Sequence, residues 1–415
     1  MARSLAKDSI PAGWKYDLLD NFATRCSGHT PSKSFPEYWD GGIKWISLSD
    51  SYRLDQGYVY ETDKEISEAG IANSSAELHP VETVVLSRDA GIGKSGVMAV
   101  PMAVSQHFIA WKCDNTEKLN SWFLYNWLQL NKAEFERQAV GSTIKTIGLP
   151  YFKKLKIAVP PYPEQNKIAK ILSTWDQAIS TTEQLLANSQ QQKKALMQQL
   201  LTGRKRLLDK NGVRFSGEWK KVRLGTVADM NSGGTPKSNI EEYYGGNIPW
   251  VSIADMTKQG KWISSTEKNL TELGLENSSA RIYPKNSVLY AMYASIGECS
   301  IAQVPLSSSQ AILGIRPKSE LNFEFLYFFL TSLKGEIKLQ GQQGTQSNLN
   351  AGMVKDFLLY LPEMEEQKKI ATVLSTADQE ITALHQKLAA LKQEKKALMQ
   401  QLLTGKRRVK VEGAA

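Results

Sequence analysis

A glycine-rich turn near residue 90 is the first stretch of this sequence that could carry out chemistry. Residues 87–95 read SRDAGIGKS and end in the Gly-Lys-Ser that closes a nucleotide-binding P-loop. The full motif needs a second glycine five positions before Gly93, and Arg88 stands there. The matching stretch later in the chain has Glu298 and Cys299 in place of the lysine and serine. We therefore expect a basic turn between strands, whose lysine can meet a phosphate, and no ATPase site.

A second short motif resembles a methyltransferase element but lacks its essential group. Residues 159–162 read VPPY, whereas amino-methyltransferases carry asparagine or aspartate before Pro-Pro-Tyr. That side chain accepts a hydrogen bond from the amine to be methylated, and Val159 has no acceptor. No glycine-rich loop for a dinucleotide or S-adenosylmethionine follows a strand elsewhere in the sequence. The chain alone is therefore expected not to be a methyltransferase.

The histidines and cysteines form no metal-binding or catalytic pattern in the sequence. The four histidines are scattered, without a cysteine or carboxylate at ligand spacing, and the three cysteines are isolated. The scattered histidines are expected to be exposed or locally bonded, with no metal site and no nucleophile beside a base. The isolated cysteines favour a reducing cytoplasm as the compartment. The residues concerned are His29, His79, His107, His385, Cys26, Cys113 and Cys299.

Length and charge bound the problem further. With 415 residues the chain can hold two or three domains, each with its own core. The net charge of +9 and the pI near 9.1 favour a polyanionic partner. The N-terminal residues lack the apolar segment of a signal peptide, and no run approaches the roughly eighteen apolar residues of a membrane span. We expect a cytoplasmic protein that does not associate with a membrane.

The whole chain is organised around one stretch that occurs twice. Residues 193–203 and 395–405 both read KKALMQQLLTG, 202 residues apart, and the similarity extends upstream to residues 164–179 and 366–381. Proline precedes each copy, and a glycine with a basic cluster ends it, which are the start and stop signals of a helix. The sequence predicts two helices of about forty residues, each near 60 Å long.

Apolar residues recur along each predicted helix in steps of four and three, which is a heptad pattern. Such a narrow stripe on so long a helix favours packing of the two helices on each other, with Lys193 and Lys395 at seam positions that fix the register. Two unrelated helices docked on separate domains would not explain why the stripe is duplicated. The seam residues are Ile168, Leu172, Trp175, Ile179, Leu186, Leu196, Leu200, Ile370, Leu374, Ile381, Leu384, Leu388, Leu391, Leu398 and Leu402.

A globular region precedes each predicted helix, and the two regions match loosely at a separation of 205 residues. Their texture is that of α+β domains, with short strands between turns and one buried helix each. Strands are predicted at 81–87, 96–104, 108–113, 153–161, 287–293, 311–316 and 354–362, and helices at 122–130 and 323–333. The predicted division is residues 1–160 and 209–361 for the domains, 161–208 and 362–409 for the helices, and 410–415 for a tail.

The framework is shared between the two globular regions, whereas their loops differ. A duplicated scaffold with divergent loops, held at a fixed separation by paired helices, is suited to reading two different short features a set distance apart. On DNA, the spacing of half-sites is set by protein geometry in this way.

These residues resemble the specificity subunit of type I restriction and modification systems over nearly the whole chain. The resemblance rests on Pro-Pro-x-x-Glu-Gln at residues 160–165, on Ala-Leu-Met-Gln-Gln-Leu-Leu-Thr-Gly in both copies, and on Ser-Gly-x-Thr-Pro at residues 27–31 and 232–236. The glutamate-glutamine pair followed by the shared helix end, twice, is the specific part. The second copy departs mildly, because Leu361 and Pro362 replace the double proline.

The resemblance implies two similar target recognition domains, separated by two long antiparallel coiled-coil helices in a pseudo-twofold internal duplication. Each domain would read one half of a bipartite, asymmetric target in double-stranded DNA, and the helices would set the spacer and dock two modification subunits. Those partners would bind S-adenosylmethionine and methylate adenine, and ATP-dependent restriction subunits with Mg would complete an endonuclease. No catalysis and no cofactor are expected in this chain itself.

Candidate DNA contacts follow from side chains of suitable type in the loops. Hydroxyls and ammonium groups in turns can meet phosphates, glutamine can bind adenine in a bidentate manner, and tyrosine can stack or donate a hydrogen bond. Gln106 and Gln310 are shared by both domains, so a structural role is equally open for them. The candidates are Thr30, Ser32, Lys33, Arg88, Lys94, Gln106, Ser142, Thr143, Lys145, Thr235, Lys237, Ser238, Tyr290, Tyr293, Gln310, Gln346, Ser347 and Asn348.

Two other functions remain open at the level of sequence. The chain could be a non-catalytic coiled-coil scaffold whose domains bind proteins or glycans without reading DNA. A third reading, an autonomous enzyme, would require the isolated chain to bind S-adenosylmethionine or turn over a substrate. Binding to duplex DNA that weakens steeply with salt separates the DNA reader from the scaffold.

Overall fold

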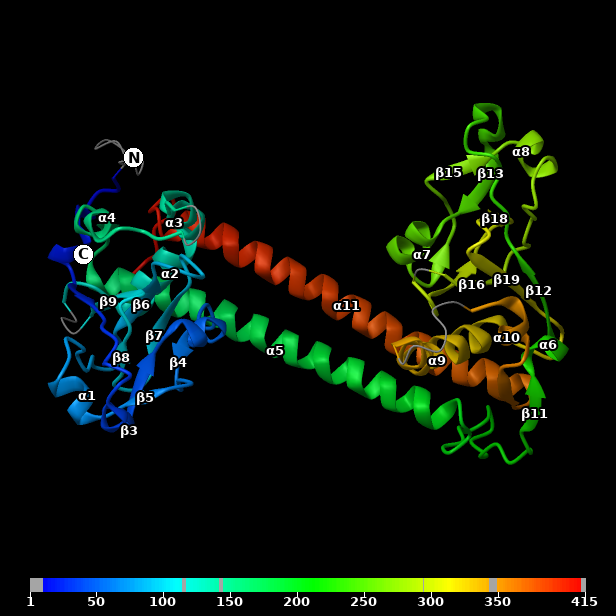
Figure 1. Ribbon diagram of the computed structural model, residues 1–415, viewed down its shortest axis with the longest axis horizontal. Helices are drawn as coiled ribbons and strands as arrows, with labels where there is room; N and C mark the ends of the chain where they lie inside the picture. Colours follow the sequence, from blue (N-terminus) through cyan, green and yellow to red (C-terminus); the bar gives the residue numbers. More distant parts are fainter. Residues whose placement is uncertain (1–9, 114–116, 142–144, 294, 343–348, 412–415) are drawn as a thin grey trace. The chain divides into compact units, whose positions relative to one another are not determined.

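The protein is described by a computed structural model that covers residues 10–113, 117–141, 145–293, 295–342 and 349–411. The chain divides into two compact units. Unit 1 is Met1–Glu183 together with Gln386–Ala415, and unit 2 is Gln184–His385. In Figure 1, unit 1 accordingly combines the blue and cyan strands with the red end of the chain.

Unit 1 is a mixed α and β structure with short strands. A five-stranded sheet has the order β2-β9-β6-β7-β4, a three-stranded sheet the order β5-β3-β8, and β1 pairs with β10. Its strands are β1 (Lys15–Leu18), β2 (Thr24–Ser27), β3 (Trp39–Ile46), β4 (Tyr58–Val59), β5 (Glu65–Ile66), β6 (Val84–Ser87), β7 (Ser95–Met98), β8 (Ala103–Val104), β9 (Phe108–Lys112) and β10 (Lys156–Val159). Its shorter helices are η2 (Leu19–Asn21), η3 (Pro36–Tyr38), η4 (Leu48–Tyr52), α1 (Glu68–Ala72), α2 (Ser121–Leu130), α3 (Lys132–Gln138) and α4 (Leu149–Lys153).

Unit 2 repeats this topology strand for strand. Its sheets have the orders β12-β19-β16-β17-β14, β15-β13-β18 and β11-β20. The strands are β11 (Lys220–Arg223), β12 (Ala228–Ser232), β13 (Tyr244–Val251), β14 (Trp262–Ile263), β15 (Lys268–Leu270), β16 (Val288–Ala291), β17 (Cys299–Ala302), β18 (Ser307–Ser308), β19 (Ile312–Pro317) and β20 (Leu358–Leu361). The helices are α6 (Leu224–Val227), η5 (Glu241–Tyr243), α7 (Ile253–Gln259), α8 (Glu272–Glu276), α9 (Phe323–Gln342) and α10 (Ala351–Lys355). The expected α+β class and internal duplication are confirmed.

The single strand predicted over residues 96–104 is wrong. The chain forms β7 and β8 there, which belong to different sheets. Pro101 lies between them and lacks the amide hydrogen that a continuous ladder needs. Pro305 lies between β17 and β18 in unit 2, so the same break is built into both copies.

The two long helices have the extents that the repeat predicts. Helix α5 spans Tyr162–Leu200 and α11 spans Met364–Leu402, 39 residues each. Each ends at a glycine in the left-handed region, Gly203 with φ of 70° and Gly405 with φ of 69°. This conformation favours glycine and closes the last turn, so the repeated glycine fixes where both helices stop.

Each unit contains the start of one long helix packed antiparallel on the end of the other. In unit 1, Asp176 of α5 lies 2.5 Å from Lys395 of α11, and Glu183 lies 2.7 Å from Lys392. In unit 2, the corresponding pair is Lys193 with Asp378. The seam lysines predicted to fix the register therefore make ion pairs between the helices, and the same pair occurs once in each unit.

The glutamine of the Glu-Gln pair fastens each long helix to its domain. Gln165 is fully buried and donates to the carbonyls of Pro160 and Lys118, at 2.9 and 3.0 Å, while its own oxygen accepts from the Asn120 amide at 2.8 Å. Gln367 makes the equivalent three bonds in unit 2. A buried amide with every bond made holds the helix start in one place.

The hydrophobic core of each unit is completed by both long helices. In unit 1, Ile168 and Leu172 of α5 and Leu402 of α11 pack with the strands and α2. Unit 2 uses Leu200 and Ile370 in the same way. Figure 1 shows the red end of α11 beside α3 of unit 1. Within the described parts of the chain, no helix combines the length and the apolar character that crossing a lipid bilayer requires.

Candidate nucleic-acid interface

The Ser-Gly-x-Thr-Pro loop of each unit is held by its glycine. A Cβ atom on Gly28 would overlap the carbonyl oxygen of Val104, and one on Gly233 would overlap that of Ser308. Only glycine allows this close approach of two backbones. The loop is also fixed from one side by a buried tryptophan of the neighbouring strand, because Trp45 Nε1 donates to the His29 carbonyl at 3.0 Å.

The same tryptophan contact exists in unit 2, where Trp250 Nε1 donates to the Gly234 carbonyl at 2.9 Å. The loop therefore has one backbone geometry in both units. The residues that follow it are free to differ without disturbing the frame. Ser32 and Lys33 are exposed in unit 1, and Lys237 and Ser238 are exposed in unit 2.

A threonine and a glutamine meet beside this loop in both units. The Thr30 hydroxyl donates to Gln106 Oε1, and the Thr235 hydroxyl donates to Gln310 Oε1. Gln106 and Gln310 are exposed. The threonine fixes the carboxamide with its oxygen inward, so the NH₂ group remains available to a base or phosphate acceptor. The shared pair thus combines a structural bond with an exposed donor.

A second loop, following β6 and β16, has one backbone frame and two sets of side chains. In unit 1, the Arg88 amide donates to the carbonyl of His107 at 3.0 Å, and the Arg88 carbonyl accepts from Ile147 at 2.8 Å. In unit 2, Met292 makes the same two bonds with Ala311 and Leu349, at 2.9 and 3.1 Å. The backbone is preserved while arginine and histidine are replaced by methionine and alanine.

Asp89 joins this loop to two others in unit 1. Its carboxylate accepts a hydrogen bond from the Thr146 hydroxyl, and its Oδ2 lies 2.5 Å from His107 Nδ1. The Arg88 Nε lies 3.8 Å from Asp89 and has no hydrogen-bond partner among the described residues. An arginine held only loosely by a neighbouring carboxylate can turn to a phosphate or a guanine edge. His107 and Asp89 carried no sequence signal, because only the fold brings them together.

Three lysines surround the Gly-Ile-Gly turn of unit 1. Lys94, Lys132 and Lys145 line a hollow of about 280 Å³ together with Gly91, Ile92 and one acidic residue, Glu136. Lys94 Nζ donates to the carbonyl of Ser51 at 2.9 Å, whereas Lys145 is exposed. The cluster presents positive charge beside Arg88, which suits a phosphate backbone.

Lys132 was not among the predicted contacts, although a signal existed. It recurs 202 residues later as Lys334, and each lysine packs against the same glycine of the turn, Gly93 or Gly297. In unit 2, Lys334 pairs with Glu298, which stands where unit 1 has Lys94. In unit 1 Lys132 pairs with Asp55, so the charge that differs between the two turns is Lys94 in unit 1 against Glu298 in unit 2.

Two of the predicted tyrosine contacts have opposite outcomes. The prediction for Tyr290 is wrong, because this residue lies on the central strand β16 and is fully buried in the core of unit 2. That burial also raises the pKa of its hydroxyl. Tyr293, three residues later, is 39% exposed and remains able to contact a ligand. Ser142, Thr143, Gln346, Ser347 and Asn348 lie outside the described residues.

All of the predicted seam residues are buried or partly buried. The buried members lie mainly near the helix ends inside the globular units, and Leu186, near the middle of α5, is also buried. Ile168, Leu172, Leu186, Leu200, Ile370, Leu374 and Leu402 are buried, and Trp175, Ile179, Leu196, Ile381, Leu384, Leu388, Leu391 and Leu398 are partly buried.

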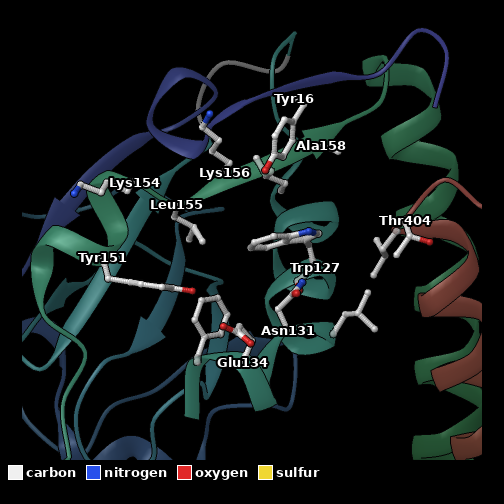
Figure 2. Close-up of a pocket in the computed structure, with 14 residues that line it drawn as sticks. Tyr16, Trp127, Asn131, Glu134, Tyr151, Lys154, Leu155, Lys156, Ala158 and Thr404 are labelled. Atoms are coloured by element: carbon white, nitrogen blue, oxygen red, sulfur yellow. The ribbon is translucent and has the colours of Figure 1, made fainter. Parts of the chain in front are cut away.

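A separate pocket of about 460 Å³ lies in unit 1 between β10, α2 and the end of α11. None of the candidate DNA contacts lines it. Figure 2 shows Trp127 and Tyr151 at this pocket, with Thr404 beside α11. A hydrogen bond from Arg137 lowers the pKa of Glu134, and burial raises that of Tyr151 to about 12.

Comparison with known proteins identifies the family to which both units belong. The family model for the type I restriction modification DNA specificity domain matches residues 11–188 and again residues 216–393. The chain belongs to this family. The expected resemblance is thereby confirmed, and the two matches fall on the two halves of the internal duplication.

Individual specificity subunits are similar over 38% to 94% of their own length. The MjaVIII specificity subunit of Methanocaldococcus jannaschii is 27% identical over 97% of this chain and 94% of its own. The MjaIX specificity subunit of the same organism is 35% identical, over 39% of this chain and 38% of its own. The EcoR124I/EcoR124II specificity subunit of Escherichia coli is 27% identical over 64% of this chain and 65% of its own.

Solved structures have the same fold. The S subunit of a type I restriction-modification system from M. genitalium aligns with a TM-score of 0.57 at 16% identity, covering 96% of this chain and 97% of that one. A chain from a structure that describes complex assembly and conformational transition of the type I R-M system aligns with a TM-score of 0.59 at 18% identity, covering 96% and 99%.

Proposed function

We propose that this protein is the DNA sequence-specificity subunit of a type I restriction-modification complex, and that each unit reads one half of a bipartite DNA target. The observation that carries the proposal is the pair of loops after β6 and β16. Their backbone bonds are the same, while the partly exposed Arg88 and His107 of one unit are replaced by the buried Met292 and the partly buried Ala311 of the other. A preserved frame with different side chains is what reading two different half-sites requires.

The proposal divides the contacts into two kinds. Lysines of the unit 1 turn, Lys145 above all, would meet phosphates and position the domain, because they carry charge without directional preference. Residues fixed by the frame, Gln106 with Thr30 and the loosely held Arg88, would read base edges. In unit 2, Gln310 with Thr235 would read a base edge in the same way as Gln106 with Thr30. Tyr293 would take the place of the charged side chains of the unit 1 loop.

The paired helices would set the spacer between the half-sites and dock two modification subunits. Those subunits would supply S-adenosylmethionine and the adenine methylation, and ATP-dependent restriction subunits with Mg would supply cleavage. This chain would have no catalytic role and hold none of these cofactors.

The test is single-molecule methylation mapping of DNA from cells that express this chain with its cognate modification subunit. A split motif of two short half-sites, carrying N6-methyladenine on both strands and lost when this chain is deleted, is the expected result. Unchanged methylation after deletion, with an active modification subunit present, would contradict the proposal.

Salt dependence of binding tests the same proposal in vitro. Affinity of the assembled complex for duplex DNA should fall steeply with salt, and Lys145→Ala should reduce the slope of log K against log salt by about 0.9. Lys210→Ala, in the segment after α5, serves as a control of equal charge change. A flat salt response of the unchanged protein would favour a protein-binding scaffold instead.

A further inference from the structure

Three side chains with metal-binding atoms meet in unit 1, next to the start of the Ser-Gly-x-Thr-Pro loop. Cys26 lies on β2, and Glu77 and His79 lie in the segment before β6. The Cys26 sulfur, a Glu77 carboxylate oxygen and a His79 ring nitrogen all lie within 4.8 Å of one another. The spacing in sequence gave no hint of this, because β2 and the His79 segment are about fifty residues apart and only the sheet brings them together.

His79 is the unusual member of this group. It is fully buried, and neither ring nitrogen has a hydrogen-bond partner among the described residues. Its backbone is fixed on both sides, because His79 and Met102 exchange amide hydrogen bonds of 2.8 and 3.1 Å. A buried imidazole without partners is costly, and native structures normally satisfy such groups with a bond, a water or an ion.

In unit 2, the residue at the position of His79 has its hydrogen bond made within the protein. Tyr283 occupies the place of His79, with the same backbone exchange, here to Leu306 at 2.7 and 3.1 Å. Its hydroxyl donates to the carbonyl of Asn231 at 2.9 Å, and Asn231 occupies the place of Cys26. Gly314 makes room, since a Cβ there would overlap the tyrosine ring. The third ligand, Glu77, is replaced by Arg281.

All three potential metal ligands of unit 1 are therefore replaced by other residue types in unit 2. Where unit 2 has a bonded tyrosine, an arginine and an asparagine, unit 1 has a thiol, a carboxylate and an imidazole around one point. Sulfur, nitrogen and oxygen donors in this combination suit zinc, which takes three protein ligands and a fourth from water or another group.

We propose that Cys26, Glu77 and His79 of unit 1 bind one zinc ion. Binding replaces the thiol proton of Cys26 by the metal, and the fourth position is open to water on the side of Glu77, which is the exposed ligand. Cys26 stands two residues before Gly28, so the ion would fasten the start of the recognition loop to the His79 segment. The site would stabilise the loop of one half-site reader only.

Lys112 is a positively charged neighbour of the proposed site, and it would repel a bound metal ion. Its Nζ lies 3.3 Å from the Glu77 carboxylate, and its side chain is 24% exposed. Removing the Lys112 ammonium should tighten zinc binding by about tenfold. A divalent ion and an ammonium a few ångströms apart repel each other, even in water, with a free energy that corresponds to roughly this factor.

The test titrates the full-length chain, freed of metal with a chelator, with Zn²⁺ alone and with Co²⁺ as a spectroscopic probe. One zinc per chain and a thiolate-to-cobalt charge-transfer band are expected. Cys26→Ser should abolish the band and weaken zinc binding at least a hundredfold, whereas Cys299→Ser should leave both unchanged. Lys112→Met should tighten binding.

A second variant guards against misfolding. The double substitution His79→Tyr with Ala110→Gly copies Tyr283 and Gly314 of unit 2, so it should fold with unchanged stability and bind no zinc. Zinc affinity of the unchanged chain equal to that of Cys26→Ser, or cobalt binding without the thiolate band, would overturn the proposal.

Discussion

Arg408 donates two hydrogen bonds, each of 2.7 Å, to the buried carboxylate of Glu164. The two residues are 244 positions apart, one in each of the two chain segments that form unit 1. Arg206 and Glu366 form the same fork in unit 2, at 2.6 and 2.7 Å. The basic cluster after each repeated helix end therefore closes on the glutamate that starts the other helix. This contact explains why the Glu-Gln pair and the helix end were duplicated together.

Removing one partner of this fork should destabilise the unit that contains it. Arg408→Ala leaves the Glu164 carboxylate buried and unpaired, and since Arg408 is partly exposed we expect a loss of about 1–2 kcal/mol. Arg206→Ala should cost a similar amount, because Arg206 is less exposed but Glu366 keeps a hydrogen bond of 3.0 Å from Trp219 Nε1. Hydrogen exchange of peptides from each unit measures this, with Lys406→Ala as the matched control. Equal destabilisation of both units by Arg408→Ala would contradict the assignment.

The Thr30 and Gln106 pair should control one half-site only. Gln106→Ala removes the exposed amide donor, and the loss of a base contact is worth about 1–3 kcal/mol of discrimination at one position. Methylation mapping should show relaxed preference in one half of the target and an intact second half. Gln310→Ala is the reciprocal variant and should relax the other half. A uniform loss of methylation across all sites would assign Gln106 a structural role instead.

Lengthening both long helices by one heptad should change the spacer and not the half-sites. Seven added residues lengthen a helix by about 10 Å, which corresponds to about three base pairs of DNA. Insertions between residues 183 and 184 and between residues 385 and 386 keep the seam in phase. Methylation mapping reads out the spacer directly. Insertion in only one helix is the control and should disrupt assembly, whereas altered half-sites in the double insertion would refute the role of the helices as a ruler.

Acid should weaken unit 1 through His79. Burial, with a smaller contribution from Lys112, lowers the pKa of His79 to about 4 from 6.5, and Glu77 opposes this only in part. Between pH 6.5 and pH 4 the folded chain binds fewer protons at His79 than the unfolded chain. The free energy of unfolding of unit 1 is therefore highest above pH 6.5 and declines as the pH falls toward 4. The full loss is about 3 kcal/mol.

The measurement for this acid effect is hydrogen exchange of unit 1 peptides at pH 5 and pH 7 in the presence of a chelator, after correction for the intrinsic exchange rates. His79→Gln removes the titrating ring and should reduce the dependence of unit 1 stability on pH, while unit 2, with Tyr283 at this place, is the internal reference. An unchanged dependence in His79→Gln would show that other groups carry it.

Much of the fold could be predicted because it is local or repeated. Helices α5 and α11 follow from a heptad pattern bounded by proline and glycine, and α2 follows from a continuous apolar run. The break at Pro101 was missed because the apolar pattern continues through it, although proline cannot bond within a ladder.

The site was less predictable, because it depends on contacts between distant segments. Tyr290 is polar enough to suggest a ligand contact, yet its place on the central strand buries it. Asp89 and His107 become neighbours only when β6 and β9 pair, and the Cys26 and His79 cluster likewise joins segments that are distant in sequence. Side-chain chemistry in a sequence identifies candidates, but the partners are decided by tertiary pairing.

The measurement that tests the central claim most directly uses a chain with two identical readers. Residues 11–160 are replaced by residues 212–361, so that both helices keep their sequence and unit 1 acquires the loops of unit 2. Methylation mapping with the cognate modification subunit should then find a palindromic target, built from two copies of one original half-site at the original spacing. An unchanged asymmetric target, or two half-sites unrelated to the original, would contradict the account.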